Sequence, residues 1–207
     1  MKKILWDFNG TILDDVEVSL DCLNTLRRIY YNLKPLTLKE YREVFTFPII
    51  GYYQKAGFDF TNLSFEKVGK QWVELYKNNS HRIVVKKNIY DFIEKHQKDY
   101  EHVILTASHI EMVKQQLKEY KIDHFFKMVL GIDNIYASSK LAIAKAYMQD
   151  KNPEDFMMFG DTLHDFDVAS EIGVKICLLA DGHQSKQRLL AYCDVVYDNI
   201  EEFSLLS

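Results

Sequence analysis

The chain has 207 residues and a formal net charge of −4, a length that allows one sizeable hydrophobic core or a core with a small insertion. The acidic balance argues against a nucleic-acid partner bound mainly by electrostatics. Cys22, Cys177 and Cys193 lie far apart and form neither a metal-binding pattern nor a disulfide framework. No apolar run approaches the roughly 18 residues of a membrane span, and no signal-peptide cleavage site follows the apolar start. We therefore expect a cytoplasmic protein with no membrane partner.

The first strand is predicted from the apolar run at residues 4–8, which Gly10 interrupts. Within this run, Asp7 lies where the buried strand ends. A carboxylate in that position loses solvent and needs a cation or hydrogen-bond donors nearby. Ligands of open parallel sheets gather at the carboxyl ends of strands, so Asp7 is the first candidate for chemistry. The alternative is an Asp that only caps a turn or the following helix.

Residues 15–83 show helical spacing of apolar residues and no convincing strand pattern. We expect Asp14 and Asp15 to cap a first helix that runs to about residue 30. A capping box at residues 37–40 opens a helix from 38 to 45, a third helix covers 49–56, and a fourth begins at Ser64. This pattern predicts a helical cap domain at residues 15–83, small enough to be a lid, inserted in a core domain made of residues 1–14 and 84–207.

Strands and helices alternate after residue 83. The predicted strands cover residues 102–106, 126–130, 155–159, 174–179 and 194–197. The predicted helices begin at Asn88, at a capping box formed by Ser108 and Glu111, at Ser138 or Ser139, and at Phe166. Such alternation predicts an α/β fold in which a doubly wound parallel sheet has helices on both faces.

Asp7, Thr106, Lys140, Asp161 and Asp165 all follow strands or begin helices at the same expected edge of this sheet. Three acidic groups that meet there need a counter-charge, which a divalent cation held by oxygen ligands, most plausibly Mg²⁺, would provide. The lysine and the threonine would then face a second anion, most simply a phosphoryl group. Taken singly, the lysine could be a surface residue and the acids could belong to a solvated loop.

The segment DFNGT at residues 7–11, Thr106, Lys140 and the segment GDTLHD at residues 160–165 resemble, in order and spacing, four motifs of the haloacid dehalogenase-like (HAD) hydrolase superfamily. The resemblance is to its phosphoglycolate-phosphatase-like members, whose C1-type cap is similar to the helical insertion. It implies a HAD-like Rossmannoid core and a Mg²⁺-dependent hydrolase of a small phosphorylated metabolite. The dehalogenase branch fits less well, because it needs no metal and both acids of the fourth motif are retained.

The resemblance also implies roles for single residues. Asp7 would be the nucleophile that forms an aspartyl-phosphate. Its second oxygen, the backbone carbonyl of Asn9 and the carboxylate of Asp161 would bind the metal. Asp165 would complete the metal shell or bond to Lys140. Lys140 and Thr106 would hold the phosphate, together with backbone amides near residue 9, at Ala107 and at Ser108.

Asn9 departs from the family pattern, which usually has an acid–base Asp at this position. An Asn keeps the shape but has no useful proton, and loss of a general acid–base typically costs ~10²–10⁴ in rate. We therefore expect attenuated turnover, and we expect Asn9→Asp to raise it by about tenfold or more. The alternative is a non-catalytic phosphate-ligand sensor or regulatory binding protein on the same fold.

The substrate and the oligomeric state, monomer or homodimer, stay open. Within the predicted cap, the candidates for substrate contact are Arg42, Phe47, Tyr52, Tyr53 and Lys55. For each of them a place in the cap core or on a solvated surface is an equal alternative. We interpret His164 as a loop histidine with a structural role, and His109 as a bystander of the second capping box, with a position that reaches the pocket as the alternative.

Overall fold

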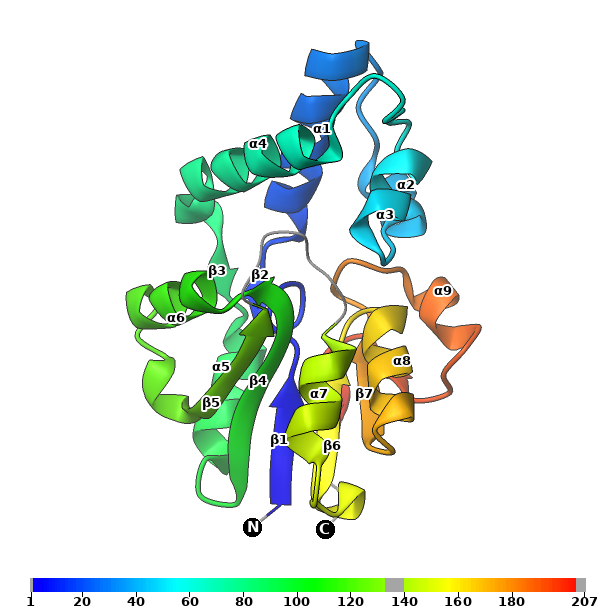
Figure 1. Cartoon of the computed structure of the whole chain (residues 1–207). Coiled ribbons are helices and arrows are strands. Elements are labelled where there is room, and N and C mark those ends of the chain that lie inside the picture. Colours follow the sequence, from blue (N-terminus) through cyan, green and yellow to red (C-terminus); the bar gives the residue numbers. More distant parts are fainter. Residues whose placement is uncertain (1, 133–139, 204–207) are drawn as a thin grey trace.

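The computed structural model describes residues 2–132 and 140–203. Its central sheet has six strands in the order β5-β4-β1-β6-β7-β8, and every neighbouring pair is parallel (Figure 1). The strands are β1 (Lys2–Trp6), β4 (Tyr100–His109), β5 (Phe126–Ile132), β6 (Phe156–Gly160), β7 (Lys175–Leu179) and β8 (Val196–Tyr197). The predicted α/β fold with a doubly wound parallel sheet is confirmed.

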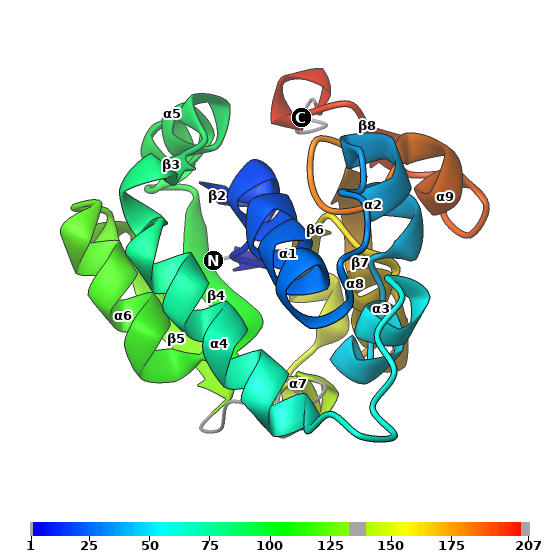
Figure 2. The ribbon, with the colours of Figure 1, turned by 90° about the horizontal axis from the view of Figure 1, so that it is seen from above.

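Both faces of this sheet are buried under helices. Successive side chains of β1 point to opposite faces, and each set packs against a different pair of helices. Ile4 and Trp6 pack into one cluster with apolar residues of α5 and α6. Leu5 packs into a second cluster with residues of α7 and α8. The helices of this part of the chain are α5 (Lys87–His96), α6 (Ile110–Glu119), α7 (Leu141–Met148), α8 (Leu163–Glu171) and α9 (Lys186–Leu190). Figure 2 shows α5 and α6 on one side of the sheet and α7 and α8 on the other.

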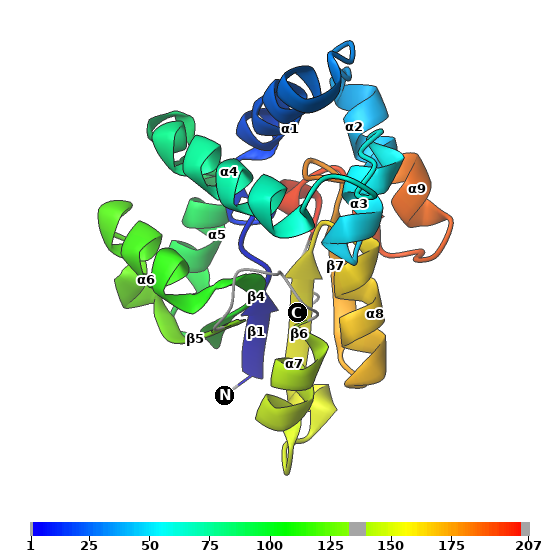
Figure 3. The ribbon, with the colours of Figure 1, turned by 45° about the horizontal axis from the view of Figure 1, so that its top comes forward.

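Four helices lie above the carboxyl edge of the sheet (Figures 1 and 3). They are α1 (Val16–Tyr31), α2 (Leu38–Val44), α3 (Ile49–Lys55) and α4 (Phe65–Asn78). An aromatic-rich cluster holds them together, with Tyr41, Tyr52 and Tyr53 buried in it. A short antiparallel pair, β2 (Leu13–Asp14) and β3 (Val84–Val85), joins the two points where the chain enters and leaves this helical segment.

Some local predictions were wrong. α5 begins at Lys87 rather than at an Asn88 cap. β4 continues to His109, whose side chain caps α6, so the capping box between Ser108 and Glu111 does not form. α8 begins at Leu163 and not at residue 166, because Thr162 and Asp165 form a capping box there. Side-chain caps explain the starts of α6 and α8, whereas α5 begins without a side-chain capping bond.

Other expectations have a different outcome. The helix start predicted at Ser138 or Ser139 lies outside the described residues, although α7 follows at Leu141. The sequence did not predict α9 or the short pair of β2 and β3. Across residues 2–132 and 140–203, no helix combines the length and the hydrophobicity that crossing a membrane requires.

Candidate active site

Three neighbouring strands bring the predicted site residues to one edge of the sheet. β1 lies between β4 and β6, so Asp7, directly after β1, is flanked by Thr106 in β4 and by Asp161 directly after β6. Lys140 precedes the first residue of α7, and Asp165 lies in the first turn of α8. Residues from four distant parts of the sequence therefore meet at this edge.

Asp7, Asp161 and Asp165 form an acidic cluster in which one ligand oxygen of each lies within 4.8 Å of the others. Burial raises the pKa of Asp7 to about 8, against the effect of Lys140 and with the help of the other two carboxylates. Burial also raises the pKa of Asp161 to about 6, against the charge of His183. Buried carboxylates this close are stabilised together by a divalent cation, and oxygen ligands suit Mg²⁺. The donor set therefore fits a magnesium site.

Lys140 is the counter-charge that the protein itself supplies. Its side chain is 1% exposed, and its ammonium lies 2.5 Å from one oxygen of Asp7 and 2.5 Å from one oxygen of Asp165. It also donates to the carbonyl of Leu105 at 3.0 Å. Burial lowers the pKa of Lys140, but the two carboxylates outweigh burial and raise the pKa above its ordinary value. Lys140 thus stays charged and fixes the orientation of Asp7.

Both carboxylate oxygens of Asp165 accept hydrogen bonds. One oxygen faces Lys140, and the other accepts from the Thr162 hydroxyl at 2.6 Å and from the backbone amides of Asp161 and Thr162 at 3.2 and 3.0 Å. Burial would raise its pKa, yet Lys140 and these hydrogen bonds lower it below the ordinary value. Asp165 therefore acts as a fixed negative group that positions the lysine.

Glycines make room for the acidic cluster. A Cβ on Gly160 would lie 2.4 Å from the Asp165 side chain, and a Cβ on Gly182 would lie 2.2 Å from an oxygen of Asp161. Gly10 combines a φ of +76° with a Cβ position 2.4 Å from the same carboxylate, so it needs glycine for two reasons. The carboxylates are thus packed directly against backbone.

Asp161 is further oriented from two sides. The Thr11 hydroxyl donates to one of its oxygens at 2.9 Å, and the backbone amide of His183 donates to the other at 2.6 Å. Thr106 and Ala107 line the same cavity as Asp7. The Thr106 hydroxyl accepts from the backbone amide of Ser108 at 3.1 Å, within the last residues of β4, where its register with β5 shifts.

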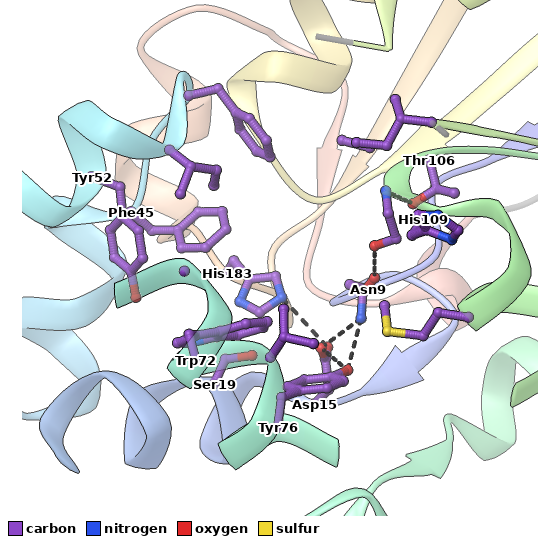
Figure 4. Close-up of a pocket in the computed structure, with 18 of the residues that line it drawn as sticks. Asn9, Asp15, Ser19, Phe45, Tyr52, Trp72, Tyr76, Thr106, His109 and His183 are labelled. Atoms are coloured by element: carbon purple, nitrogen blue, oxygen red, sulfur yellow. Dashed lines mark hydrogen bonds and ion pairs between the residues drawn. The ribbon is translucent and has the colours of Figure 1, made fainter. Parts of the chain in front are cut away.

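The amide of Asn9 makes hydrogen bonds through both ends (Figure 4). Its nitrogen donates to Asp15 at 2.8 Å and to the Tyr76 hydroxyl at 2.8 Å, and its oxygen accepts from the Ser108 hydroxyl at 2.7 Å. Asp15, predicted to cap the first helix, makes no side-chain capping bond to α1. That prediction was wrong, because Asp15 is 1% exposed and instead accepts from Gly10, Asn9 and Tyr76.

His183 is a site residue that the sequence analysis missed. Its ring stacks on Phe45 at 4.6 Å, one nitrogen lies 2.8 Å from the Tyr41 hydroxyl, and the other lies 3.4 Å from Asp15. Burial lowers the pKa of His183, but Asp15 outweighs it and raises the pKa above its ordinary value. The available signal was its place four residues after the end of the buried strand β7, at the same sheet edge as Asp7.

A cavity of about 490 Å³ opens above the acidic cluster, between the sheet edge and helices α1–α4. Of the predicted substrate contacts, Phe47, Tyr52 and Tyr53 line it. Arg42 and Lys55 lie outside this lining: Arg42 donates to the carbonyl of Gly182 at 3.0 Å, and Lys55 is exposed at the end of α3.

Two histidines also line this cavity. His164 lies within α8 and not in a loop, as the sequence suggested, and it stacks on Phe47 at 4.4 Å. Burial lowers its pKa to about 4, so it is neutral near pH 7. His109, expected to be a bystander, is the capping residue of α6 and reaches the cavity wall.

The arrangement joins an oriented carboxylate, a buried lysine and a fitted cation site at the floor of a cavity. Comparison with known proteins agrees with a hydrolase site of this kind: the family model described as haloacid dehalogenase-like hydrolase matches residues 4–179. The chain belongs to this family. Two curated relatives are both named Pyrophosphatase PpaX. The one from Anoxybacillus flavithermus is 26% identical over 93% of this chain and 89% of its own length, and the one from Bacillus mycoides is 25% identical over 98% and 94%.

Solved structures show the same haloacid dehalogenase-like fold. A predicted phosphatase from Clostridium acetobutylicum aligns with a TM-score of 0.77 at 17% identity, over 97% of this chain and 95% of that one. CbbY from Rhodobacter sphaeroides, solved in complex with phosphate, aligns with a TM-score of 0.75 at 17% identity, over 98% and 96%. The family model shows that this protein is a haloacid dehalogenase-like hydrolase, and the relatives that it resembles carry pyrophosphatase or phosphatase names.

Proposed function

We propose that this hydrolase is a Mg²⁺-dependent phosphatase that acts on phosphate monoesters of small metabolites and uses Asp7 as its nucleophile. The observation that supports it best is the position of Asp7, whose carboxylate is oriented by Lys140 at 2.5 Å beside two further carboxylates at the floor of the cavity. We further propose that residues 15–83 act as a cap that closes over the bound ester and limits access of water.

In the proposed reaction the protein contributes a nucleophilic carboxylate and the groups that hold the phosphoryl oxygens. One oxygen of Asp7 attacks phosphorus, the bond from phosphorus to the leaving alcohol breaks, and the electron pair leaves with the alcohol oxygen. Water then attacks the aspartyl-phosphate, so inorganic phosphate leaves and the carboxylate of Asp7 is restored. Lys140 and Thr106 hold the phosphoryl oxygens throughout.

The carboxylates of Asp7 and Asp161 and the backbone carbonyl of Asn9 would hold Mg²⁺, with Asp165 beside them. The bound ion would neutralise charge on the phosphoryl oxygens. Asn9 offers no proton to the leaving alcohol, so that proton comes from solvent. Esters with weakly basic leaving groups therefore lose least from the substitution at position 9.

A phosphate-ligand sensor is the second candidate, and the observation in its favour is Asn9. Its amide is hydrogen-bonded at both ends inside the protein and it has no titratable proton. Such a site would bind a phosphorylated ligand with Mg²⁺ and turn it over slowly or not at all.

Hydrolysis of 4-nitrophenyl phosphate with and without Mg²⁺ tests the choice. We expect Mg²⁺-dependent release of phosphate by the natural chain and its loss in Asp7→Asn, while Asp91→Asn on the exposed face of α5 keeps it. Mass spectrometry of acid-quenched protein should find the phosphoryl adduct on the peptide that contains Asp7. Mg²⁺-dependent binding without release or adduct would favour the sensor. Inorganic pyrophosphate belongs in the substrate panel, because the curated relatives are named pyrophosphatases.

A further inference from the structure

The wall of the cavity that faces the acidic cluster is built from aromatic rings. They come from helices α2, α3 and α4 and from the segment between α2 and α3. Figure 4 shows four of them, at positions 45, 52, 72 and 76, gathered on one side of the cavity. The rings that line it are Tyr41, Phe45, Phe47, Tyr52, Tyr53, Phe65, Trp72 and Tyr76. Phe45, Phe47 and Trp72 are only partly buried, so part of each ring remains available to a ligand.

These rings offer faces rather than polar groups. Trp72 stacks on Tyr76 with ring centroids 4.8 Å apart and planes inclined by 23°. Phe45 and Phe47 stack in the same way on His183 and His164. The hydroxyl groups of Tyr41 and Tyr76 are bonded to His183 and Asp15 within the protein. Stacked faces of this kind suit a planar or bulky apolar group.

Cations are scarce on this wall. Among the described residues that line the cavity, lysine occurs at positions 77 and 140, arginine does not occur, and histidine occurs at positions 109, 164 and 183. Of these histidines, His183 is paired with Asp15 and His164 is neutral near pH 7. Lys140 is buried between Asp7 and Asp165 at the floor, and Lys77 is exposed near the end of α4. Two further lining residues are acidic: Glu66 pairs with Lys70, and Glu111 pairs with Lys114.

A second anionic group on a substrate would lie in this aromatic part of the cavity. Its charge would lose water without gaining a buried cation that is not already paired with an aspartate, which is unfavourable. An uncharged aromatic or apolar group gains free energy from the same burial. The floor of the cavity can therefore bind one phosphoryl group, and the aromatic wall can bind an uncharged organic group attached to it.

We propose that the preferred substrate is a phosphate monoester with an uncharged aromatic or large apolar leaving group, rather than pyrophosphate or a carboxylated phosphoester. This inference rests on the proposed function, since it assigns the floor to the phosphoryl group. It separates this chain from relatives whose name indicates pyrophosphate, which carries anionic charge on both halves. A cavity of about 490 Å³ is within the range of sites for small organic ligands.

Binding of non-hydrolysable phosphonates tests this without relying on turnover. Calorimetry with Mg²⁺ compares benzylphosphonate, methylphosphonate, phosphonoacetate and methylenediphosphonate. We expect benzylphosphonate to bind about tenfold to a hundredfold more tightly than methylphosphonate, as burial of a phenyl ring predicts. We also expect it to bind more tightly than phosphonoacetate and methylenediphosphonate, which carry a second acidic group. Preference for phosphonoacetate or methylenediphosphonate would overturn the inference and leave the proposed function standing. Failure of all four to bind would overturn both.

Variants of the wall identify the residues responsible. Trp72→Ala and, separately, Phe47→Ala should each reduce the ratio of benzylphosphonate to methylphosphonate affinity by about fivefold or more. Tyr192→Ala, an aromatic truncation at a residue that is 65% exposed and outside the cavity lining, should keep the ratio. Thermal melts confirm which variants are folded. The two wall variants lie in different segments, so if one of them does not fold, the other still tests the proposal. An unchanged ratio in a folded wall variant would contradict the proposal.

Discussion

The side-chain nitrogen of Asn9 donates a hydrogen bond of 2.8 Å to a carboxylate oxygen of Asp15. The same oxygen accepts from the Tyr76 hydroxyl at 2.7 Å, and the other oxygen accepts from the backbone amide of Gly10 at 2.7 Å. Burial raises the pKa of Asp15, but His183 and these donors outweigh it, so its pKa lies below the ordinary value. An ionised carboxylate only accepts hydrogen bonds. Position 9 therefore needs a donor, which Asn supplies and an ionised Asp does not.

This pairing changes what Asn9→Asp should do. The sequence alone led us to expect a rise in turnover of about tenfold or more. With Asp15 in contact, the new carboxylate would face a second one, so we expect the single variant to gain less than about tenfold. We also expect it to lose about 2 kcal/mol in the free energy of unfolding. Adding Asp15→Asn places an amide donor at position 15 opposite the new carboxylate at position 9. The double variant should gain about tenfold or more in kcat and recover the lost free energy of unfolding.

Steady-state kinetics and urea unfolding measure these two effects. Asp14→Asn is the matched control for the second change, because Asp14 is exposed in β2 and adjacent in sequence. Combined with Asn9→Asp it should give no recovery. Equal kcat for the single variant and the Asn9→Asp, Asp15→Asn double variant would show that the carboxylate contact does not limit position 9.

Lys140→Met should destabilise the protein strongly. It leaves the carboxylates of Asp7 and Asp165 buried without their counter-charge, and removal of one partner from a buried ion pair costs about 3–5 kcal/mol. Urea unfolding without added metal measures this loss. Lys145→Met, in the helix α7 that Lys140 precedes, removes an exposed pair with Glu171 and should change stability by less than about 1 kcal/mol. Similar losses in both variants would mean that Lys140 is not the essential counter-charge.

Gly182→Ala should weaken Mg²⁺ binding by about tenfold or more. The added Cβ would lie 2.2 Å from an oxygen of Asp161, so the carboxylate must move, and metal affinity depends on ligand placement. The shift of the melting temperature with Mg²⁺ concentration reports the affinity. Gly69→Ala in α4 meets nothing within 4 Å and should keep the affinity while adding about 1 kcal/mol of stability. An unaltered Mg²⁺ affinity in Gly182→Ala would place the metal away from Asp161.

His102 should make the fold sensitive to acid. Burial lowers its pKa from 6.5 to about 4, and its Nδ1 accepts from the Trp6 indole at 2.9 Å. Because the unfolded chain binds this proton more tightly, the contribution is complete above about pH 6.5 and is lost as the pH falls toward 4. We expect His102 to account for about 2 kcal/mol of the stability lost between pH 7 and pH 5.

The comparison with His102→Gln isolates that contribution. A glutamine oxygen can accept from Trp6 but takes up no proton in this range. Denaturant unfolding of both proteins from pH 7 to pH 5 should therefore show a flatter pH dependence for the variant. Parallel curves for the two proteins would assign the acid sensitivity to other groups.

The sequence by itself determined the parallel fold and the chemical types at its edge. Apolar runs such as residues 102–106 and the alternation with helices follow from local periodicity, which a sequence displays directly. Asp7, Asp161 and Asp165 were identifiable because each stands where a buried strand or its following turn ends. The assignment of Lys140 depended on family resemblance, since nothing local distinguishes a buried lysine from an exposed one.

Only the tertiary structure decided which groups touch. Asp15 precedes a helix and resembles a cap in the sequence, yet its carboxylate is bound by Asn9 and Gly10 in the preceding loop and by Tyr76 and His183 from distant segments. His183 lies 142 residues from Tyr41 and 168 from Asp15, so no local pattern reveals that it joins them. The aromatic wall has the same origin, because burial and orientation of side chains depend on packing between distant segments. These contacts set the hydrogen bonding of Asn9 and the character of the cavity.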